Sequence, residues 1–303
     1  AMFGIYNMDL TTAKIPLDDP KTYELFSAGS TIGIFQFSKS KMREYLSKLK
    51  PKNINDLAAM NALYRPGPMK LIPDFIDKRH GKKPITYLHP ILENSLNETY
   101  GIIVYQEQVM QIAREFAGFS MAEADNMRKA MGKKDKEIMK DVKAKFVKGS
   151  LEKKMNKKIA EELFKLMEDF ADYGFNKSHG VAYSILAFYT AYLKAHFPLE
   201  FLSVSMECRK DDEVELQLFA NECKKMKVDL KQPDVNLSMM DFSINYNKTD
   251  KYVGEIRYGL SALKNVGEKA AINIVNERKE NGEYKSFVDF LIRVDLRLVN
   301  KKT

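Results

Sequence analysis

Residues 120–134, SMAEADNMRKAMGKK, form the stretch on which the fold prediction rests. Ser120 and Glu123 have the spacing of a capping box, in which each side chain accepts a hydrogen bond from a backbone N–H that the first helical turn leaves unpaired. Apolar residues then recur at intervals of three and four, which predicts one buried face: Met121, Ala124, Met127, Ala130 and Met131. Gly132 is a residue type that often ends a helix in the left-handed conformation. The stretch therefore predicts a helix that begins at a cap and ends at Gly132.

Four cations gather at the end of this predicted helix. Arg128 and Lys129 lie in its last turns, and Lys133 and Lys134 lie just beyond. Cations near a helix C-terminus interact favourably with the macrodipole, but Lys129 and Lys133 repel each other at a spacing of four residues. No carboxylate occurs between Asn126 and Lys134 to reduce this repulsion. An anionic partner from outside the helix would relieve it; the alternative is a plain solvated basic face.

The positive charge of the chain is concentrated in one segment. Residues 128–158 contain thirteen Lys and Arg against four Asp and Glu, a net charge of +9, whereas the whole chain carries +8 and the remainder is therefore near −1. A field concentrated in this way steers and holds phosphates. The sequence therefore predicts nucleic acid or nucleotide as the partner class.

Composition and length indicate a globular intracellular protein. With 303 residues, 45% of them hydrophobic, the chain can bury a substantial core and is expected to form two domains. Cys208 and Cys223 have no CxxC partner or nearby ligand set, which indicates reduced cysteines and neither a disulfide nor a zinc site. No export signal is evident at the start, and the most apolar run, residues 181–193, is shorter than the roughly 20 residues that span a bilayer. We expect a buried core helix there and no membrane contact.

Periodicity along the chain predicts a mainly α fold with a few short strands. Helices are expected at residues 21–27, 41–49, 54–63, 73–80, 105–116, 159–170, 181–193, 199–207 and 214–226. Alternating residues predict a strand at 31–37 and a hairpin over 241–258 that turns at 245–247. From Gly259 onward, the pattern predicts two helical segments joined by a tight turn at 265–267.

A proline-rich loop follows the predicted helix at 54–63. Residues 65–68, RPGP, must leave that helix because both prolines lack a backbone donor and disfavour a helical residue before them. Arg65 is therefore presented on a stiff loop, where a binding residue loses less entropy than on a flexible one.

A second polar loop, residues 173–180 with the sequence YGFNKSHG, precedes the most apolar helix. Ser178 is a candidate N-cap for that helix. Asn176 and Lys177 flank its N-terminus, and together they predict an anion site. His179 is either a satisfied loop histidine or a functional one.

Several longer strings occur in the order in which the family C bacterial replicative DNA polymerases carry them. They are GIFQF, ALYRPGPM, TYGIIVYQEQVMQIA, EADNMRKAMGKK, YGFNKSHGVAYSILAFYTAYLKAHFPLEF and PDVN. Through these strings nearly the whole chain resembles the fingers region of that family, the family of the DNA polymerase III alpha subunit. The resemblance implies a multi-helix fingers domain that closes over the nascent base pair, followed by a small hairpin and a helix-hairpin-helix module that grips duplex DNA. The implied parts are a connector from an upstream palm domain at 1–20, fingers at 21–208, a linking helix and hairpin at 209–252, and an incomplete helix-hairpin-helix module at 253–303.

The resemblance also implies nucleotide-binding residues. Arg128 and Lys129 fall where the family places basic contacts to the triphosphate of the incoming nucleotide. The other residues expected to face the nucleotide and template are Lys133, Lys134, Arg65, Asn176, Lys177 and His179. The family commonly has arginine where Lys129 stands. Lysine keeps the charge but lacks the bidentate fork, so we expect a looser phosphate contact there.

DNA contacts are implied for the C-terminal hairpin, at Lys264, Asn265, Val266, Gly267 and Lys269. Asn265 replaces the family's first hairpin glycine, and the turn stays feasible because asparagine tolerates the left-handed conformation better than other side chains. The alternative function is a non-enzymatic nucleic-acid-binding module whose basic arm, residues 133–158, and hairpin contact backbone phosphates without sequence preference. An interaction scaffold with a solvated basic face is the third class.

Catalytic residues and a metal site are not expected in this sequence. Nucleotidyl transfer uses carboxylates that hold two divalent ions about 4 Å apart. Asp18 and Asp19 lie in a proline-bounded turn and Asp211 and Asp212 open a surface helix, so neither pair suits this task. By resemblance, the catalytic aspartates and the Mg2+ ions belong to a palm domain upstream. We therefore expect a DNA-directed DNA polymerase of the cytoplasm as the full-length protein and an inactive fragment here. The expected partners are primer-template DNA, deoxynucleoside triphosphates, the sliding clamp and other replicase subunits.

Overall fold

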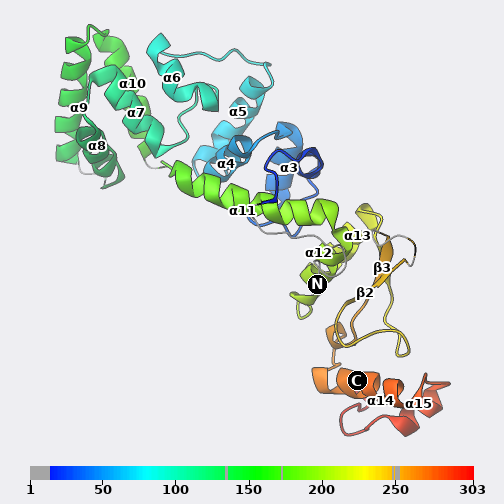
Figure 1. The fold of residues 1–303 in the computed structure, drawn as a ribbon. Coiled ribbons are helices and arrows are strands. Elements are labelled where there is room, and N and C mark those ends of the chain that lie inside the picture. Colours follow the sequence, from blue (N-terminus) through cyan, green and yellow to red (C-terminus); the bar gives the residue numbers. More distant parts are fainter. Residues whose placement is uncertain (1–13, 134–135, 172, 248, 250–252) are drawn as a thin grey trace. The chain divides into compact units, whose positions relative to one another are not determined.

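The computed structural model describes residues 14–133, 136–171, 173–247, 249 and 253–303. Helices dominate it, and its strands form one small three-stranded sheet (Figure 1). The predicted mainly α fold is therefore confirmed. Among the described residues, no helix is both long and apolar enough to cross a membrane.

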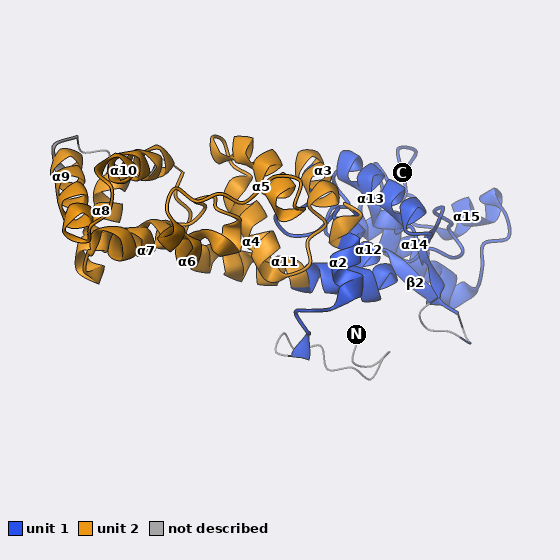
Figure 2. Ribbon diagram, turned by 90° about the horizontal axis from the view of Figure 1, so that it is seen from above, with its two compact units in different colours: residues 1–25, 30–39, 189–303 blue, residues 26–29, 40–188 orange. Residues whose placement is uncertain are grey.

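The chain divides into two compact units, which Figure 2 distinguishes by colour. Unit 1 comprises residues 1–25, 30–39 and 189–303, and unit 2 comprises residues 26–29 and 40–188. The domain boundaries at residues 20, 208 and 252 that the sequence suggested remain a prediction.

Unit 2 is built from helices and short 3-10 turns. Its helices are α3 (Ser40–Leu49), α4 (Ile54–Leu63), α5 (Ile72–Arg79), α6 (Glu93–Leu96), α7 (Gln106–Ala117), α8 (Met121–Lys133), α9 (Lys136–Glu152), α10 (Lys157–Ala171) and the first part of α11 (Lys177–His196). The 3-10 turns are η2 (Pro68–Leu71), η3 (Pro90–Leu92) and η4 (Asn97–Thr99). Helices α7 to α10 share one hydrophobic core, which fixes the position of α8 and its cations.

Phenylalanine rings from three helices form the centre of this core. The Phe116 ring of α7 stacks on Phe146 of α9 with centroids 6.1 Å apart, and Phe146 meets Phe164 of α10 at 5.6 Å. Helices α7 and α9 approach closely because position 149 is a glycine. A Cβ there would lie 2.2 Å from the carbonyl oxygen of Ala117.

Unit 1 combines helices, the sheet and the C-terminal hairpin. It holds most of α2 (Pro20–Ser27), the last part of α11, α12 (Pro198–Glu207), α13 (Glu213–Lys225), the 3-10 turn η5 (Leu260–Ala262), α14 (Glu268–Asn281) and α15 (Phe287–Arg293). The strands are β1 (Asp229–Lys231), β2 (Ser243–Tyr246) and β3 (Gly254–Arg257). The sheet order is β1-β3-β2, with β1 parallel and β2 antiparallel to β3.

A buried ion pair connects three segments of unit 1. Nζ of Lys194 in α11 donates to Oε1 of Glu222 in α13 at 2.6 Å. It also donates to the carbonyl oxygens of Ser30 and Ile32, both at 2.8 Å. All three ammonium hydrogens therefore have acceptors, which is the condition under which a buried charge is tolerated.

Local predictions were right for most helices and wrong for one strand. Residues 31–37 form consecutive hydrogen-bonded turns and not a strand, with Phe37 N–H donating to the Ile34 carbonyl at 3.1 Å. Gly33 and Gln36 have φ of +79° and +64°, which a strand does not allow. The 241–258 hairpin is present as β2 and β3, but its connection spans residues 247–253 and not 245–247.

Candidate nucleotide and nucleic-acid interface

The predicted capping box fixes the start of α8. Oε2 of Glu123 accepts a hydrogen bond from the Ser120 N–H at 2.8 Å, and Oγ of Ser120 accepts one from the Glu123 N–H at 3.3 Å. Lys145 of α9 adds an ion pair to Glu123 at 2.6 Å. Lys145 and the Ser120 backbone lower the pKa of the Glu123 carboxyl to about 2. The prediction that Gly132 ends this helix is wrong by one residue, since α8 extends to Lys133.

Ala124, Met127, Ala130 and Met131 of α8 are buried as predicted, but Met121 is 59% exposed, so the buried face begins after the first residue of the helix. Arg128 and Lys129 have side chains that are 31% and 58% exposed. Nε and Nη2 of Arg128 donate to Oδ1 of Asp125 at 3.0 and 2.8 Å. Nζ of Lys129 pairs with Oδ2 of the same carboxylate at 2.8 Å. Both hydrogen-bonded cations lower the pKa of Asp125, Lys129 more than Arg128.

Gln106 at the start of α7 joins this cation pair to the second polar loop. Its Oε1 accepts from Nη1 of Arg128 at 3.3 Å, and its Nε2 donates to the Gly174 carbonyl at 3.0 Å. Its backbone N–H donates to the Phe175 carbonyl at 2.9 Å. Gln106 therefore connects three segments that are far apart in the sequence: the start of α7, the helix α8 and the loop at residues 174–175.

Arg65 belongs to the same contact network, with its guanidinium held by protein groups. Nη2 donates to the Tyr173 carbonyl at 2.6 Å and Nε to the Ala62 carbonyl at 3.0 Å. The guanidinium also lies over the Phe175 ring, 4.4 Å from its centroid. Partial burial lowers the pKa of Arg65. Gly67 lies in close contact with Tyr173, since a Cβ at position 67 would lie 2.0 Å from Cε1 of Tyr173.

Asn176, and not Ser178, caps α11. Oδ1 of Asn176 accepts from the His179 N–H at 2.8 Å. Helix α11 begins at Lys177, so Ser178 already lies within its first turn and is not the cap that the sequence predicted.

The polar groups of Asn176 and Lys177, which the sequence predicted to form an anion site, bond to carboxylates of the protein itself. Glu107 of α7 accepts from Nδ2 of Asn176 at 2.9 Å and from the Lys177 N–H at 3.0 Å. Nζ of Lys177 pairs with Glu98 at 2.6 Å. A carboxylate is a small anion, so these contacts demonstrate the kind of partner that this helix start accepts.

The remaining nucleotide-site candidates are only partly described. His179 is exposed, with its ring centroid 4.0 Å from that of Tyr183 and 5.4 Å from that of Phe175. The side chain of Lys133 and the whole of Lys134 lie outside the described residues. Within unit 2, Gln106 thus connects Arg128 to the 173–175 segment that also binds Arg65, and Glu107 connects Asn176 and Lys177 to α7.

The C-terminal hairpin of unit 1 turns at residues 263–266, where the Val266 N–H donates to the Leu263 carbonyl at 3.0 Å, and not at 265–267; of the two predicted helical segments, the first is only the 3-10 turn η5. Asn265 has φ of +68°, which confirms that asparagine adopts the left-handed conformation here. Gly267 precedes α14, and apart from its chain neighbours no described atom lies within 4 Å of a Cβ built on it. The backbone of this turn is therefore open to a ligand.

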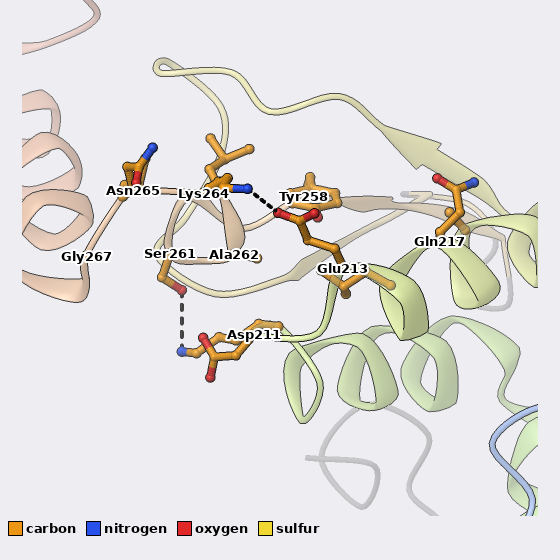
Figure 3. A pocket seen from close by; sticks show the side chains of 14 residues that line it. Asp211, Glu213, Gln217, Tyr258, Ser261, Ala262, Lys264, Asn265 and Gly267 are labelled. Atoms are coloured by element: carbon orange, nitrogen blue, oxygen red, sulfur yellow. Dashed lines mark hydrogen bonds and ion pairs between the residues drawn. The ribbon is translucent and has the colours of Figure 1, made fainter. Parts of the chain in front are cut away.

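A hollow of about 570 Å3 lies beside this hairpin (Figure 3). Lys264, Asn265, Val266 and Gly267 line one side of it, and residues of α13 line the other. Nζ of Lys264 pairs with Oε1 of Glu213 across the hollow at 3.3 Å. Lys269, the last DNA-contact candidate, is exposed in the first turn of α14.

Much of the basic arm is a solvent-exposed helix. Along α9 the exposed lysines are Lys140, Lys143, Lys145 and Lys148.

Cys208 and Cys223 are free. Within the described part of the chain, no group of three or more His, Cys, Asp or Glu side chains is arranged to hold a metal ion.

Comparison with known proteins identifies the class of protein first. A family model described as the bacterial DNA polymerase III alpha subunit finger domain matches residues 4–154. A helix-hairpin-helix motif matches residues 227–303, so it begins before the sheet and includes it. The chain thus combines a segment similar to a polymerase finger domain with a segment similar to a helix-hairpin-helix motif.

Individual relatives identify the family. The DNA polymerase III subunit alpha of Borreliella burgdorferi is 43% identical over 296 residues, covering 98% of this chain and 25% of the relative. The Thermus aquaticus subunit is 44% identical over 305 residues, covering 97% of this chain and 24% of the relative. The Caulobacter vibrioides subunit is 44% identical over 294 residues, with 97% and 25% covered. The chain belongs to the DNA polymerase III alpha subunit family, and it spans about a quarter of the length of these relatives.

Proposed function

We propose that this chain is the part of a replicative DNA-directed DNA polymerase that binds the incoming deoxynucleoside triphosphate and grips primer-template DNA. The observation that carries the proposal is the similarity of almost the whole chain to DNA polymerase III alpha subunits. The charge distribution supports it, because the net positive charge lies in the segment that contains Arg128 and Lys129. In the full-length protein, the sliding clamp and other replicase subunits are further proposed partners, in the cytoplasm.

The proposed nucleotide site is the exposed end of α8. Arg128 and Lys129 carry two positive charges, and Asp125 carries one negative charge beside them. Both cationic side chains remain partly exposed. Cations in such a position neutralise charge on the transferred phosphoryl group and on the leaving pyrophosphate. Arg65, Asn176 and Lys177 support this pair indirectly, because their polar groups bond to other parts of unit 2.

The proposed DNA contact is the hairpin at residues 264–269. Its open backbone at Gly267 and the exposed Lys264 and Lys269 suit phosphate contacts that carry no sequence information. Glu213 and Glu268 lie close by, so we expect a modest dependence on salt at this hairpin and a steeper one at the basic arm.

The paired acids of this chain do not fit a two-metal site. Oδ2 of Asp19 accepts from the Thr22 N–H and Oγ1 at the start of α2, and His196 lies 3.0 Å from the same oxygen. Oδ1 of Asp212 accepts from two backbone N–H groups at the start of α13. We therefore propose that Mg2+ is held by residues outside this chain, and that the chain alone incorporates no nucleotide.

Two binding measurements on the same samples test the proposal. We would measure dATP by isothermal titration and a fluorescent primer-template by anisotropy, for the wild-type chain and for Arg128→Ala/Lys129→Ala. The double variant should lose about tenfold or more in dATP affinity while its DNA affinity stays within about twofold, since removed charge-assisted hydrogen bonds contribute about 1.5–3 kcal/mol each.

A matched control removes the same charge elsewhere in unit 2. Lys52 and Lys82 are exposed, so Lys52→Ala/Lys82→Ala lowers the net charge equally without touching α8. Equal losses of dATP affinity in both double variants would contradict the proposed nucleotide site. Lys264→Ala/Lys269→Ala should show the reverse pattern, with weaker DNA binding and unchanged dATP binding.

A further inference from the structure

One carboxylate, that of Asp125, holds both members of the proposed triphosphate-binding pair. Oδ1 accepts from two nitrogens of Arg128 and Oδ2 pairs with Lys129, at distances between 2.8 and 3.0 Å. The two cations lower the pKa of Asp125, so the carboxylate is ionised at neutral pH. The pair therefore has a resident anion before any ligand arrives.

The bonding of Arg128 leaves donors available for a second anion. A guanidinium has five N–H donors, and contacts with Asp125 and Gln106 use three of them. The Lys129 ammonium has three donors, of which the ion pair with Asp125 uses one. These counts refer to contacts among the described residues. Phosphate oxygens can approach the unused donors, but they then lie close to the Asp125 carboxylate.

We propose that Asp125 sets the affinity of this site, as a resident counter-anion that the nucleotide's phosphates must displace from Arg128 and Lys129. The inference rests on the proposed function, because it assigns a further residue to the same site. A triphosphate carries more charge than a carboxylate and competes for both cations at once. Asp125 thereby keeps the pair ordered and partly neutral when no nucleotide is bound, and it opposes retention of the pyrophosphate product.

The geometry distinguishes Asp125 from the other acids of the network. Glu98 and Glu107 bond to Lys177 and Asn176, which already make contacts inside unit 2. Among the described residues, the Asp125 carboxylate bonds to the side chains of Arg128 and Lys129, which are 31% and 58% exposed. Its removal therefore changes the charge at the ligand-facing surface and leaves the folded framework in place.

The test compares Asp125→Asn with a matched control in the same unit. Asparagine keeps the size of the side chain and still accepts a hydrogen bond from Arg128. The control, Asp169→Asn, removes one exposed carboxylate from α10. Isothermal titration with inorganic tripolyphosphate and with dATP, at low and high salt, gives the dissociation constants. We expect Asp125→Asn to bind both about fivefold more tightly at low salt, with a smaller gain at high salt, since one unit charge a few ångströms from the ligand is removed. The control should change by less than about twofold, as its carboxylate is screened.

A combined variant separates failure of this inference from failure of the proposed function. In the background Arg128→Ala/Lys129→Ala, the gain from Asp125→Asn should become smaller, because Asp125 then only repels the phosphates and no longer competes for these cations. If Asp125→Asn binds tripolyphosphate no more tightly than wild type while Arg128→Ala/Lys129→Ala binds it weakly, the inference is overturned and the proposed site stands. If neither wild type nor Asp125→Asn binds either probe, both are overturned.

Discussion

Replacing Gly67 by alanine tests how tightly the RPGP loop and the 173–175 segment interlock. Gly67 has φ of +100°, and a Cβ built on it would lie 2.0 Å from Cε1 of Tyr173. The backbone conformation costs alanine about 1–3 kcal/mol relative to glycine, and an overpacked contact costs about 1–3 kcal/mol more. We therefore expect Gly67→Ala to lower the free energy of unfolding by about 2–6 kcal/mol.

Gly81 provides the matched control within the same unit. Its φ is +70°, but apart from its chain neighbours no described atom lies within 4 Å of an added Cβ. Gly81→Ala should therefore cost only the backbone part, about 1–3 kcal/mol. Urea unfolding followed by far-ultraviolet circular dichroism measures both, because the chain contains no tryptophan for a fluorescence signal. A difference between the two variants of less than about 0.5 kcal/mol would refute the close contact with Tyr173.

The same pair of variants connects stability to the proposed site. Movement of Tyr173 displaces the carbonyl that Arg65 binds, and with it the Gly174 carbonyl that holds Gln106. Gln106 in turn contacts Arg128. Gly67→Ala should therefore weaken triphosphate binding in samples that remain folded, whereas Gly81→Ala should leave it unchanged.

Three further perturbations are predicted from single contacts. Asn176→Ala should lower the free energy of unfolding by about 1 kcal/mol through loss of the α11 cap, and Ser178→Ala should be nearly neutral in the same urea titrations; equal costs would contradict the assignment of the cap. Ionised Glu123 stabilises the start of α8. This stabilisation should be fully present above the ordinary glutamate pKa of 4.5 and lost as the pH falls through the Glu123 pKa of about 2. Glu123→Gln should therefore flatten the pH dependence of thermal unfolding in that window. Lys194→Met should cost about 3–5 kcal/mol because Glu222 is left buried and unpaired, and Lys194→Met/Glu222→Leu should recover most of it in chemical unfolding; a small cost for the single variant would contradict the buried pair.

Helices with one apolar face, such as α7, were predictable from the sequence because their buried residues recur at intervals of three and four. Helix α4 has the predicted bounds, and α5 and α12 begin one residue before their predicted starts. The segment 31–37 shows where this reasoning fails. Ile32, Ile34 and Phe37 are buried in successive turns, so the spacing of two between Ile32 and Ile34 imitates a strand although no partner strand is present beside these residues in the described chain. Strand β1 has three residues, too few for a period of two to be recognised.

In the site, local contacts were predictable and long-range ones were not. The capping box of Ser120 and Glu123 and the turn at Asn265 depend on neighbours in the sequence, and both are present. Asp125 lies one residue before the carboxylate-free span 126–134, and its spacings of three and four to Arg128 and Lys129 indicate the two ion pairs that the sequence prediction lacked. Nothing local indicates that Gln106 would meet Gly174, because that contact depends on how the helices of unit 2 pack.

Charge alone would treat Arg65, Lys177, Arg128 and Lys129 as equivalent phosphate ligands, but their contacts differ. Arg65 donates its hydrogen bonds to backbone carbonyls, and its guanidinium lies over the Phe175 ring. Lys177 is paired with Glu98. A phosphate would have to break these contacts to recruit either residue, whereas at Arg128 and Lys129 it meets unused donors beside one exchangeable carboxylate. Substitution of Arg65 or Lys177 should therefore reduce stability together with affinity, and only the α8 pair should separate the two.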